Sequence, residues 1–303
     1  MDYKLSILVP TYNRLSLFEE TLASILSQIK DEPVHLAIVD DGSTEGNYEL
    51  ALELSQKYPF IEVGRHEKNL GVGQARNTLL SMAKGEYSLF FDSDDLLLEE
   101  SLKEMLTLIM SNEAECYVLN TYRQKKKKLK FKPFPEDKSS LSLLEAYIDG
   151  AFSEALYLIR TEVAKKYPCN PNLRVREDFA QKACYLLFTN FKVVNKPFAI
   201  IREYPFRLRK MADYYFEHAL ASVDDLFSRL PEAYQSLKPY ALAKTYFDLS
   251  KKAYHTGSYE KAMEYLQKSL KCYPELKRSF KTLKLLAKIY SKRALSYLNL
   301  KKK

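Results

Sequence analysis

The stretch Tyr87-Ser-Leu-Phe-Phe-Asp-Ser-Asp-Asp-Leu96 decides the fold, because a short apolar run leads directly into three carboxylates. The run Ser88–Phe91, which lies between Gly85 and an acidic turn, predicts a buried strand. A carboxylate at the exit of a buried strand needs a partner, since an unpaired charge in a low-dielectric interior is costly. A divalent cation that bridges phosphate oxygens needs only one or two protein carboxylates, so Asp92 and Asp94 are candidate metal ligands. A solvated acidic turn is the alternative that this triplet leaves open.

Polar residues also follow the two strands that we expect earlier in the chain. The first strand, Leu5–Val9, runs into Pro10-Thr-Tyr-Asn13, and the second, Val34–Val39, runs into Asp40-Asp-Gly-Ser43. Helical spacing of apolar residues follows each strand, and this alternation predicts a mostly parallel sheet with helices on both faces. In such α/β sheets ligands bind outside the carboxyl ends of the strands. The sequence therefore predicts a ligand crevice at these polar ends.

The remaining elements of the first two thirds follow the same logic of periodicity and punctuation. We expect helices at 15–28, 48–57, 71–83, 99–111, 141–148 and 179–188, strands at 60–63, 116–121 and 191–201, and a strand or a buried segment at 155–160. The basic segment Tyr122–Lys138 predicts a loop or an irregular hairpin at the sheet edge, and Tyr204–Lys210 predicts a polar linker. Two domains are expected, at residues 1–210 and 211–303.

Helical spacing continues throughout the second domain. Tyr254–Ala262, followed by Leu266, Leu270 and Pro274, has the spacing of a tetratricopeptide-like helical pair. One such pair has to pack on neighbouring helices to bury its apolar face. Its exposed apolar faces also make a homo-oligomer a possible outcome.

The last expected helix, Phe280–Leu298, is amphipathic and basic. Its apolar side holds Phe280, Leu283, Ala287, Tyr290, Ala294 and Tyr297, and beside or opposite them lie Lys281, Lys284, Lys288 and Lys292. Two interpretations remain open for this apolar stripe. It packs on the preceding helical pair, or it lies on an anionic membrane surface.

Composition and charge limit the possible function classes. The chain has 303 residues, 46% of them hydrophobic, and a net charge of +8, which fit a soluble globular protein with an anionic partner. We find no secretory leader and no apolar run of the ~18–20 residues that a membrane span needs. None of the four cysteines forms a C-x-x-C motif. We therefore expect a cytoplasmic protein. A nucleic-acid partner is not expected, because no nucleic-acid-binding motif is present.

Five motifs occur in an order that closely resembles the inverting family-2 glycosyltransferases with the GT-A fold. They are Ile7-Leu-Val-Pro-Thr-Tyr-Asn-Arg14, Val39-Asp-Asp-Gly-Ser43, Asn69-Leu-Gly-Val-Gly-Gln-Ala-Arg-Asn77, Phe91-Asp-Ser-Asp-Asp95 and Arg176-Glu-Asp178. The resemblance covers about residues 3–205 and leaves out the carboxy-terminal helices. It implies a donor that is a nucleoside diphosphate sugar, with a UDP-sugar expected, and Mn²⁺ or Mg²⁺ as cofactor.

The resemblance also implies where the donor binds. Pro10, through its backbone, and Tyr12 would frame the nucleobase. Asp41 would accept a hydrogen bond from the base, with Asp40 beside it. Arg76 would face the base or the diphosphate.

The reacting end of the donor would lie among the later motifs. Asp92 would contact the ribose or the metal ion, and Asp94 would coordinate the metal. Asp178 would be the catalytic base, supported by Glu177. This fits the chemistry of an inverting transfer, in which a carboxylate takes the proton of an acceptor hydroxyl, an effect of ~10²–10⁴-fold on rate. The expected acceptor is a cell-surface glycan, a lipid-linked oligosaccharide or a glycoprotein glycan.

Other interpretations compete with this one. Gly71-Val-Gly73 could open a dinucleotide site, but Arg76 replaces the third glycine of that motif. A catalytically degenerate scaffold that binds partners through its helices is the alternative from another class, and a donor-hydrolysis assay would separate the two.

The resemblance also implies that Arg207 and Arg209 could form a flap over the diphosphate. A peripheral membrane location is a hypothesis that rests on the basic last helix.

Overall fold

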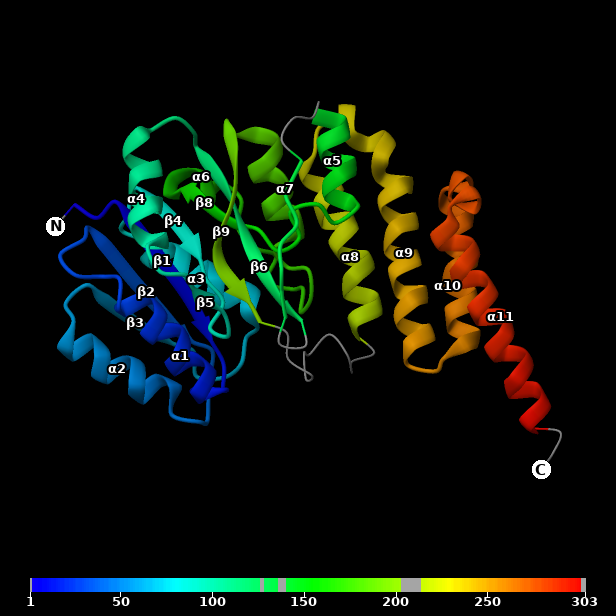
Figure 1. The fold of residues 1–303 in the computed structure, drawn as a ribbon, viewed down its shortest axis with the longest axis horizontal. Helices are drawn as coiled ribbons and strands as arrows, with labels where there is room; N and C mark the ends of the chain where they lie inside the picture. The colour runs from blue at the N-terminus through cyan, green and yellow to red at the C-terminus, as the bar shows by residue number, and fades with distance from the viewer. Residues whose placement is uncertain (1, 126–127, 136–139, 203–213, 301–303) are drawn as a thin grey trace. The chain divides into compact units, whose positions relative to one another are not determined.

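The computed structural model divides the chain into two compact units, residues 1–212 and 213–303, and each is described by itself. Figure 1 shows both units, coloured from the amino to the carboxyl terminus. The structure describes residues 2–125, 128–135, 140–202 and 214–300, with side chains up to residue 292 in the last helix. The predicted linker with Arg207 and Arg209, and the side chains of Ala294 and Tyr297, lie outside the described residues.

The first unit is built on a nine-stranded sheet with the order β3-β2-β1-β4-β8-β6-β9-β5, and β7 pairs with β6. The strands are β1 (Leu5–Thr11), β2 (Val34–Asp40), β3 (Ile61–Arg65), β4 (Tyr87–Phe90), β5 (Leu96–Leu97), β6 (Cys116–Lys125), β7 (Lys128–Lys130), β8 (Leu156–Arg160) and β9 (Phe191–Ile201). Strands β1 and β2 are buried along their whole length, as expected for near-continuous apolar runs in a parallel sheet.

The sheet was predicted to be mostly parallel, but only about half of its strand pairs are parallel. Strands β3, β2, β1 and β4 are parallel to one another, whereas β8 runs antiparallel to both β4 and β6. Strand β9 is parallel to β6, and the short β5, which was not predicted, is antiparallel to β9. The reason for the difference is long-range, because β8 pairs with strands that lie some 40 to 70 residues earlier in the chain.

In the described residues of the first unit, seven helices pack around this sheet. They are α1 (Leu15–Leu26), α2 (Asn47–Lys57), α3 (Val72–Met82), α4 (Ser101–Ser111), α5 (Ser140–Ile148), α6 (Thr161–Lys166) and α7 (Phe179–Phe188). The six predicted helices are present, and the short α6 was missed. The basic segment after residue 122 forms part of a β6–β7 hairpin, which confirms the hairpin alternative. One core of strand residues and helix faces, from Leu5 to Ala199, holds these layers together.

Topology brings the polar strand ends to one edge of the sheet. Strand β1 lies between β2 and β4 and is parallel to both, so the chain leaves all three strands at the same edge. Figure 1 shows these strands side by side, from blue to cyan. The crevice predicted from the sequence is therefore formed by segments that lie about 30 and 50 residues apart along the chain (Tyr12, Asp41 and Asp92).

The predicted first strand stops at Val9, but β1 continues through Pro10 to Thr11. Proline is tolerated here because of the direction in which its backbone faces. The Leu8 carbonyl accepts a hydrogen bond from Phe91 on the β4 side, and the Thr11 carbonyl accepts one from Asp41 on the β2 side. By alternation, the backbone of Pro10 faces the β4 side, just beyond the point where β4 has ended. No ladder hydrogen bond is lost there.

The second unit consists of helices α8 (Tyr214–Arg229), α9 (Lys238–His255), α10 (Tyr259–Cys272) and α11 (Phe280–Leu300), with 3₁₀ turns at Glu232–Leu237 and Pro274–Arg278. Helices α9 and α10 form the predicted helical pair, joined at Gly257, whose φ of 82° suits glycine. Ser250 and Ser269 donate hydrogen bonds to the carbonyls of Ala262 and Ala243 across the pair, at 2.6 and 2.7 Å. In the described part of the chain, no helix is both long enough and apolar enough to span a bilayer.

Helix α11 packs on the pair with a different face from the predicted one. Thr282, Leu285 and Ile289 are buried, and the last two join the core of the unit. Phe280 and Tyr290, from the stripe that was expected either to pack or to meet a membrane, are exposed. For the described part of the stripe the packing interpretation was therefore wrong, because the preceding pair packs on the opposite side of the helix, at Leu285 and Ile289.

Candidate active site

Asp41 closes the loop that follows β2 onto the loop that precedes α3. Its Oδ1 accepts hydrogen bonds from the backbone N–H of Leu70 at 2.9 Å and from His66 Nδ1 at 2.7 Å, and its Oδ2 accepts from the N–H of Gly71 at 2.8 Å. His66 Nε2 in turn lies 3.0 Å from the Thr78 hydroxyl. A carboxylate has about four lone-pair positions, so this arrangement uses three and leaves room for one further donor.

Asp40 has a structural role that differs from that of Asp41. It is fully buried, and its oxygens accept the backbone N–H of Ser43 at 3.1 and 3.3 Å. Arg65 Nε lies 3.5 Å from the same carboxylate. Asp40 therefore stabilises the turn that presents Asp41.

The loops after β1 and β2 are tied together at the crevice. Asn47 donates one hydrogen bond to the Thr11 hydroxyl and another to the Asn13 carbonyl, and the Asn13 side chain accepts from the N–H of Thr44 at 2.9 Å. Tyr12 stands between these contacts with its ring exposed. These bonds fix the positions of the two strand ends before any ligand binds.

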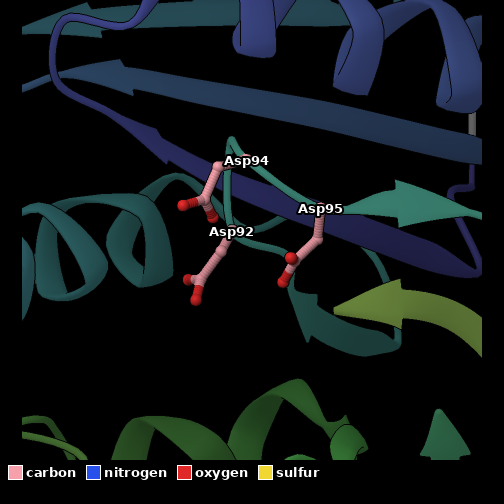
Figure 2. Close-up of side chains that lie close together, drawn as sticks. All are labelled: Asp92, Asp94 and Asp95. Carbon is pink, nitrogen blue, oxygen red and sulfur yellow. The ribbon is translucent and has the colours of Figure 1, made fainter. Parts of the chain in front are cut away.

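The acidic turn between β4 and β5 carries Asp92, Asp94 and Asp95, whose side chains Figure 2 shows together. One carboxylate oxygen from each lies within 4.8 Å of the others. Hard oxygen ligands suit Mg²⁺ and Mn²⁺, and one or two carboxylates suffice when substrate phosphate oxygens and water complete the shell. Asp92 is exposed and Asp94 is half-buried, so both can reach a ligand, whereas Asp95 is buried. The donor set fits a divalent cation held by the two predicted residues.

Two arginines hold this turn from opposite sides. Arg14 Nη1 lies 2.9 Å from Asp94 Oδ2 in a partly exposed ion pair. Asp95 Oδ1 accepts the backbone N–H of Arg202 at 2.8 Å, and the Arg202 side chain donates to the Asp94 carbonyl. Asp95 therefore anchors the end of β9, which explains why its carboxylate is buried.

Arg76 joins the acidic turn to the Glu-Asp motif. Its guanidinium contacts Asp92 at 2.8 Å, Glu177 at 2.5 Å and Asp178 at 3.4 Å, and the side chain is 9% exposed. Lys182, one turn into α7, lies 2.6 Å from the same oxygen of Asp178. The sequence predicted Arg76 opposite the base or the diphosphate, whereas the structure places it among the carboxylates. Its contact to a donor stays a prediction.

Helix α3 positions the Glu-Asp motif by close packing. A Cβ added to Gly73 would lie 3.0 Å from the Asn170 carbonyl oxygen and 3.2 Å from Glu177 Cβ, so glycine allows the loop to approach. Asn77, one turn later, exchanges two hydrogen bonds of 3.0 Å with the backbone of Cys169. The sequence motif that ends in Asn77 therefore holds both ends of the 169–177 loop against α3.

Burial and charge shift the acid–base equilibria within the cluster. Burial alone would lower the pKa of Arg76, but the negative charges of Asp92, Glu177 and Asp178 outweigh it and raise that pKa well above its usual value. Although the Asp92 side chain is half-exposed, the protein around it removes part of its hydration, which would raise its pKa, but the charge and hydrogen bond of Arg76 outweigh this effect and lower that pKa. Burial and the adjacent Asp178 charge raise the pKa of Glu177 against the attraction of Arg76. Arg76 thus stabilises the charge of the most exposed of its partners.

The structure brings the predicted residues into two groups. Asp92, Asp94, Glu177, Asp178 and Arg76 form one acidic cluster, and Pro10, Tyr12, Asp40 and Asp41 form the edge beside it. Arg14, His66 and Lys182 were missed. Arg14 and Lys182 could have been found from the sequence. Arg14 ends the first motif, and Lys182 lies one helical turn after Asp178. His66 carried none, because its distance from Asp41 is set only by strand pairing.

Known proteins share both the sequence pattern and this architecture. The model of glycosyl transferase family 2 matches residues 6–166, more than half of the chain. The poly(ribitol-phosphate) beta-glucosyltransferase of Bacillus spizizenii is 34% identical over 114 residues, which are 37% of this chain and 18% of that protein. Glycosyltransferase GlyG of Streptococcus pneumoniae is 30% identical over 122 residues, 40% of each chain. The chain thus spans well under two thirds of either relative.

Solved structures agree on the fold. Residues 1–349 of TarS from S. aureus superpose with a TM-score of 0.64 at 21% identity, over 95% of this chain and 88% of that chain, and the same fragment has been solved with UDP-GlcNAc. The mannosyltransferase PcManGT of Pyrobaculum calidifontis, in complex with GDP-Man and Mn²⁺, gives 0.51 at 16% identity, over 96% and 87%. The predicted GT-A fold and the family resemblance are confirmed. By its sequence motifs, its sheet topology and the family model, which covers four of the five motifs, the chain belongs to glycosyl transferase family 2.

Proposed function

We propose that the protein is an inverting glycosyltransferase that moves a sugar from a nucleoside diphosphate sugar to an acceptor hydroxyl. The observation that carries this proposal is the arrangement around Arg76, which links the acidic turn of Asp92 to Asp178. A cation site for the leaving diphosphate and a carboxylate for the acceptor hydroxyl thereby lie within one cluster. Residues 1–210 would form the transferase domain, and residues 211–303 a separate helical domain.

The donor is a UDP-sugar in this proposal. Support comes from the structural neighbour that has been solved with UDP-GlcNAc, and from the crevice edge of this chain. Pro10 and Tyr12 would frame the base, and the remaining lone-pair position of Asp41 would accept its N–H. Asp40 would act through the turn that presents Asp41. The sugar is a hexose or an N-acetylhexosamine.

Asp94 and Asp92 would hold Mn²⁺ or Mg²⁺. Such an ion, when bound, stabilises the growing negative charge of the leaving diphosphate as a Lewis acid. Arg14 would compete with the cation for the Asp94 carboxylate, because its Nη1 lies 2.9 Å from Oδ2. Arg76 would keep Asp92 ionised and in place.

Asp178 would act as the general base. Its side chain is 21% exposed, so an acceptor hydroxyl can reach the carboxylate, whereas Glu177 is buried and supports it through Arg76. A base that activates the hydroxyl for direct attack on the anomeric carbon gives one displacement without a covalent intermediate, which inverts the configuration. The acceptor would be a cell-surface glycan, a lipid-linked oligosaccharide or a glycoprotein glycan. The named relative that acts on poly(ribitol-phosphate) supports the first of these classes.

A donor screen tests this proposal. Thermal stability and donor hydrolysis would be measured for the purified protein with UDP-, GDP-, CDP- and dTDP-sugars, each with and without Mn²⁺. We expect a UDP-sugar to raise the melting temperature and to be hydrolysed slowly, and both effects to require the metal. Asp94→Asn should abolish the metal-dependent part of both signals.

The matched control is Asp31→Asn, which removes an exposed carboxylate outside the site. It should behave like the unchanged protein. Stabilisation by a GDP-sugar would correct the nucleotide alone. If no donor stabilised the protein or was hydrolysed, and Asp178→Asn left the glycans of the producing cell unaltered, the proposed activity would be wrong and the scaffold interpretation would take its place.

A further inference from the structure

The outward half of helix α11 carries an apolar stripe that the second unit leaves uncovered. Phe280, Leu283 and Tyr290 are 76%, 53% and 57% exposed, and Ala287 is exposed between them. With 3.6 residues per turn, these four positions fall on one strip of the helix. This stripe therefore marks a binding surface.

A row of lysines runs beside the apolar stripe. Lys281, Lys284, Lys288 and Lys292 are all exposed and lie between that stripe and the buried face of the helix. In the printed sequence, every charged residue from Lys277 to the end is Lys or Arg. The surface of α11 that faces away from its own unit is thus half apolar and half cationic.

We propose that this surface of α11 binds an anionic lipid membrane, with the helix lying parallel to the bilayer plane. The apolar stripe would enter the boundary between head groups and acyl chains, and the lysines would reach anionic head groups along its side. Charge decides between the possible occupants. A second copy packed through the same face would bring like-charged lysine rows together, whereas an anionic surface attracts them. This inference does not depend on the proposed transferase activity.

Vesicle co-sedimentation tests the apolar half of this surface. The full chain is mixed with phosphatidylcholine vesicles that contain either no phosphatidylglycerol or about 30% of this anionic lipid. We expect binding only to the anionic vesicles, and less binding at high salt because exposed charges are screened. The triple change Phe280→Ser, Leu283→Ser and Tyr290→Ser should lower the partition coefficient by at least about tenfold, since each side chain loses its apolar burial.

The cationic half needs its own pair of variants. Lys281→Gln, Lys284→Gln and Lys288→Gln should also weaken binding by about tenfold or more. The matched control changes three exposed lysines of the first unit, Lys103, Lys165 and Lys166, to Gln, with the same loss of charge. This control should retain binding. Circular dichroism would confirm that each variant is folded, which is expected because all the altered side chains are exposed.

Three results would overturn the proposal. The first is equal partitioning of the α11 variants and the control. The second is binding to soluble polyphosphate that the lysine changes abolish and the serine changes leave intact, which would indicate a polyanion site without lipid insertion. The third is a dimer in light scattering that the serine changes dissolve, which would assign the stripe to a second copy.

Discussion

The two groups of carboxylates in the site are held in opposite ways. Asp41 is fixed by two backbone N–H groups and by His66 Nδ1. The acidic cluster is instead held by cationic side chains, with Arg76 on Asp92 and Arg14 on Asp94. Backbone donors are part of the fold and stay in place, whereas arginine and lysine side chains can exchange one anion for another. The first region is therefore a fixed support, and the second is a set of charges that a ligand can rearrange.

This difference predicts which substitutions affect the stability of the site and which affect cation binding and turnover. Changes around Asp41 should act through the stability of the crevice edge. Changes in the acidic cluster should act through cation binding and turnover while the fold persists, except at Arg76, which is buried among three carboxylates. The four predictions below test this division, beginning with the largest effect.

Asp178→Asn should separate turnover from binding most sharply. The amide keeps the shape of the side chain but cannot take a proton, so transfer should fall by about 10²–10⁴-fold. Donor affinity, measured by calorimetry, should stay within a few fold of the unchanged protein. Glu177→Gln should reduce the rate less, because Glu177 is buried behind Arg76. Equal rates for Asp178→Asn and the unchanged protein would remove Asp178 from its proposed role.

Arg76→Met should destabilise the fold itself. It removes the partner of three carboxylates and leaves Glu177 buried without a cation, a loss of about 3–5 kcal/mol in the free energy of unfolding. Urea denaturation measures this loss. Arg123→Met is the matched control, because Arg123 makes an ion pair with Glu154 at the surface and should contribute about 0–1 kcal/mol. If both variants lost the same stability, Arg76 would not be the buried link between the two carboxylate motifs.

The sequence was most informative where a short segment decides its own structure. The run Leu5–Val9 predicted a strand and the acidic turn after β4 predicted a cation site, because buried strands and clustered carboxylates have strong local signatures. The order of the parallel strands then followed from the alternation of strands and helices. Strand β8 was predicted as an element but not as antiparallel, since its direction is set by neighbours that lie some 40 to 70 residues away in sequence.

The contacts within the site were less predictable than its members. Asp178 and Arg76 were named from motifs, but their contact joins segments about 100 residues apart. The packing of Gly73 against Glu177 and the hydrogen bonds of Asn77 to Cys169 set that distance. Helix α11 shows the same limit, because its amphipathic pattern identified an apolar stripe but could not reveal that Leu285 and Ile289 are the residues that pack.

Asp41→Asn should test the fixed support. The amide retains one oxygen, so one of the N–H groups of Leu70 and Gly71 would face an NH₂ group instead of an acceptor. A buried donor without a partner costs about 1–3 kcal/mol, which urea denaturation would detect, and donor binding should weaken in parallel. Asp31→Asn, an exposed change elsewhere in the same unit, should leave both unchanged. A variant that bound donor poorly but kept full stability would make Asp41 a ligand contact alone.

Arg14→Gln should give the smallest effect and a gain of function. Arg14 lies 2.9 Å from Asp94 in a partly exposed pair, so its charge competes with a cation for that carboxylate, and exposed pairs of this kind are worth about 0–1 kcal/mol. Removing the arginine charge should therefore tighten Mn²⁺ binding a few fold in calorimetry, with little change in the free energy of unfolding. Chelation with EDTA should abolish donor hydrolysis in both proteins, but the variant should recover it at lower Mn²⁺. Weaker Mn²⁺ binding in Arg14→Gln would mean that the arginine orients Asp94 for the metal. The acidic turn would then be held as rigidly as the Asp41 region. The two regions would differ mainly in the contacts that Arg76 makes to the carboxylates.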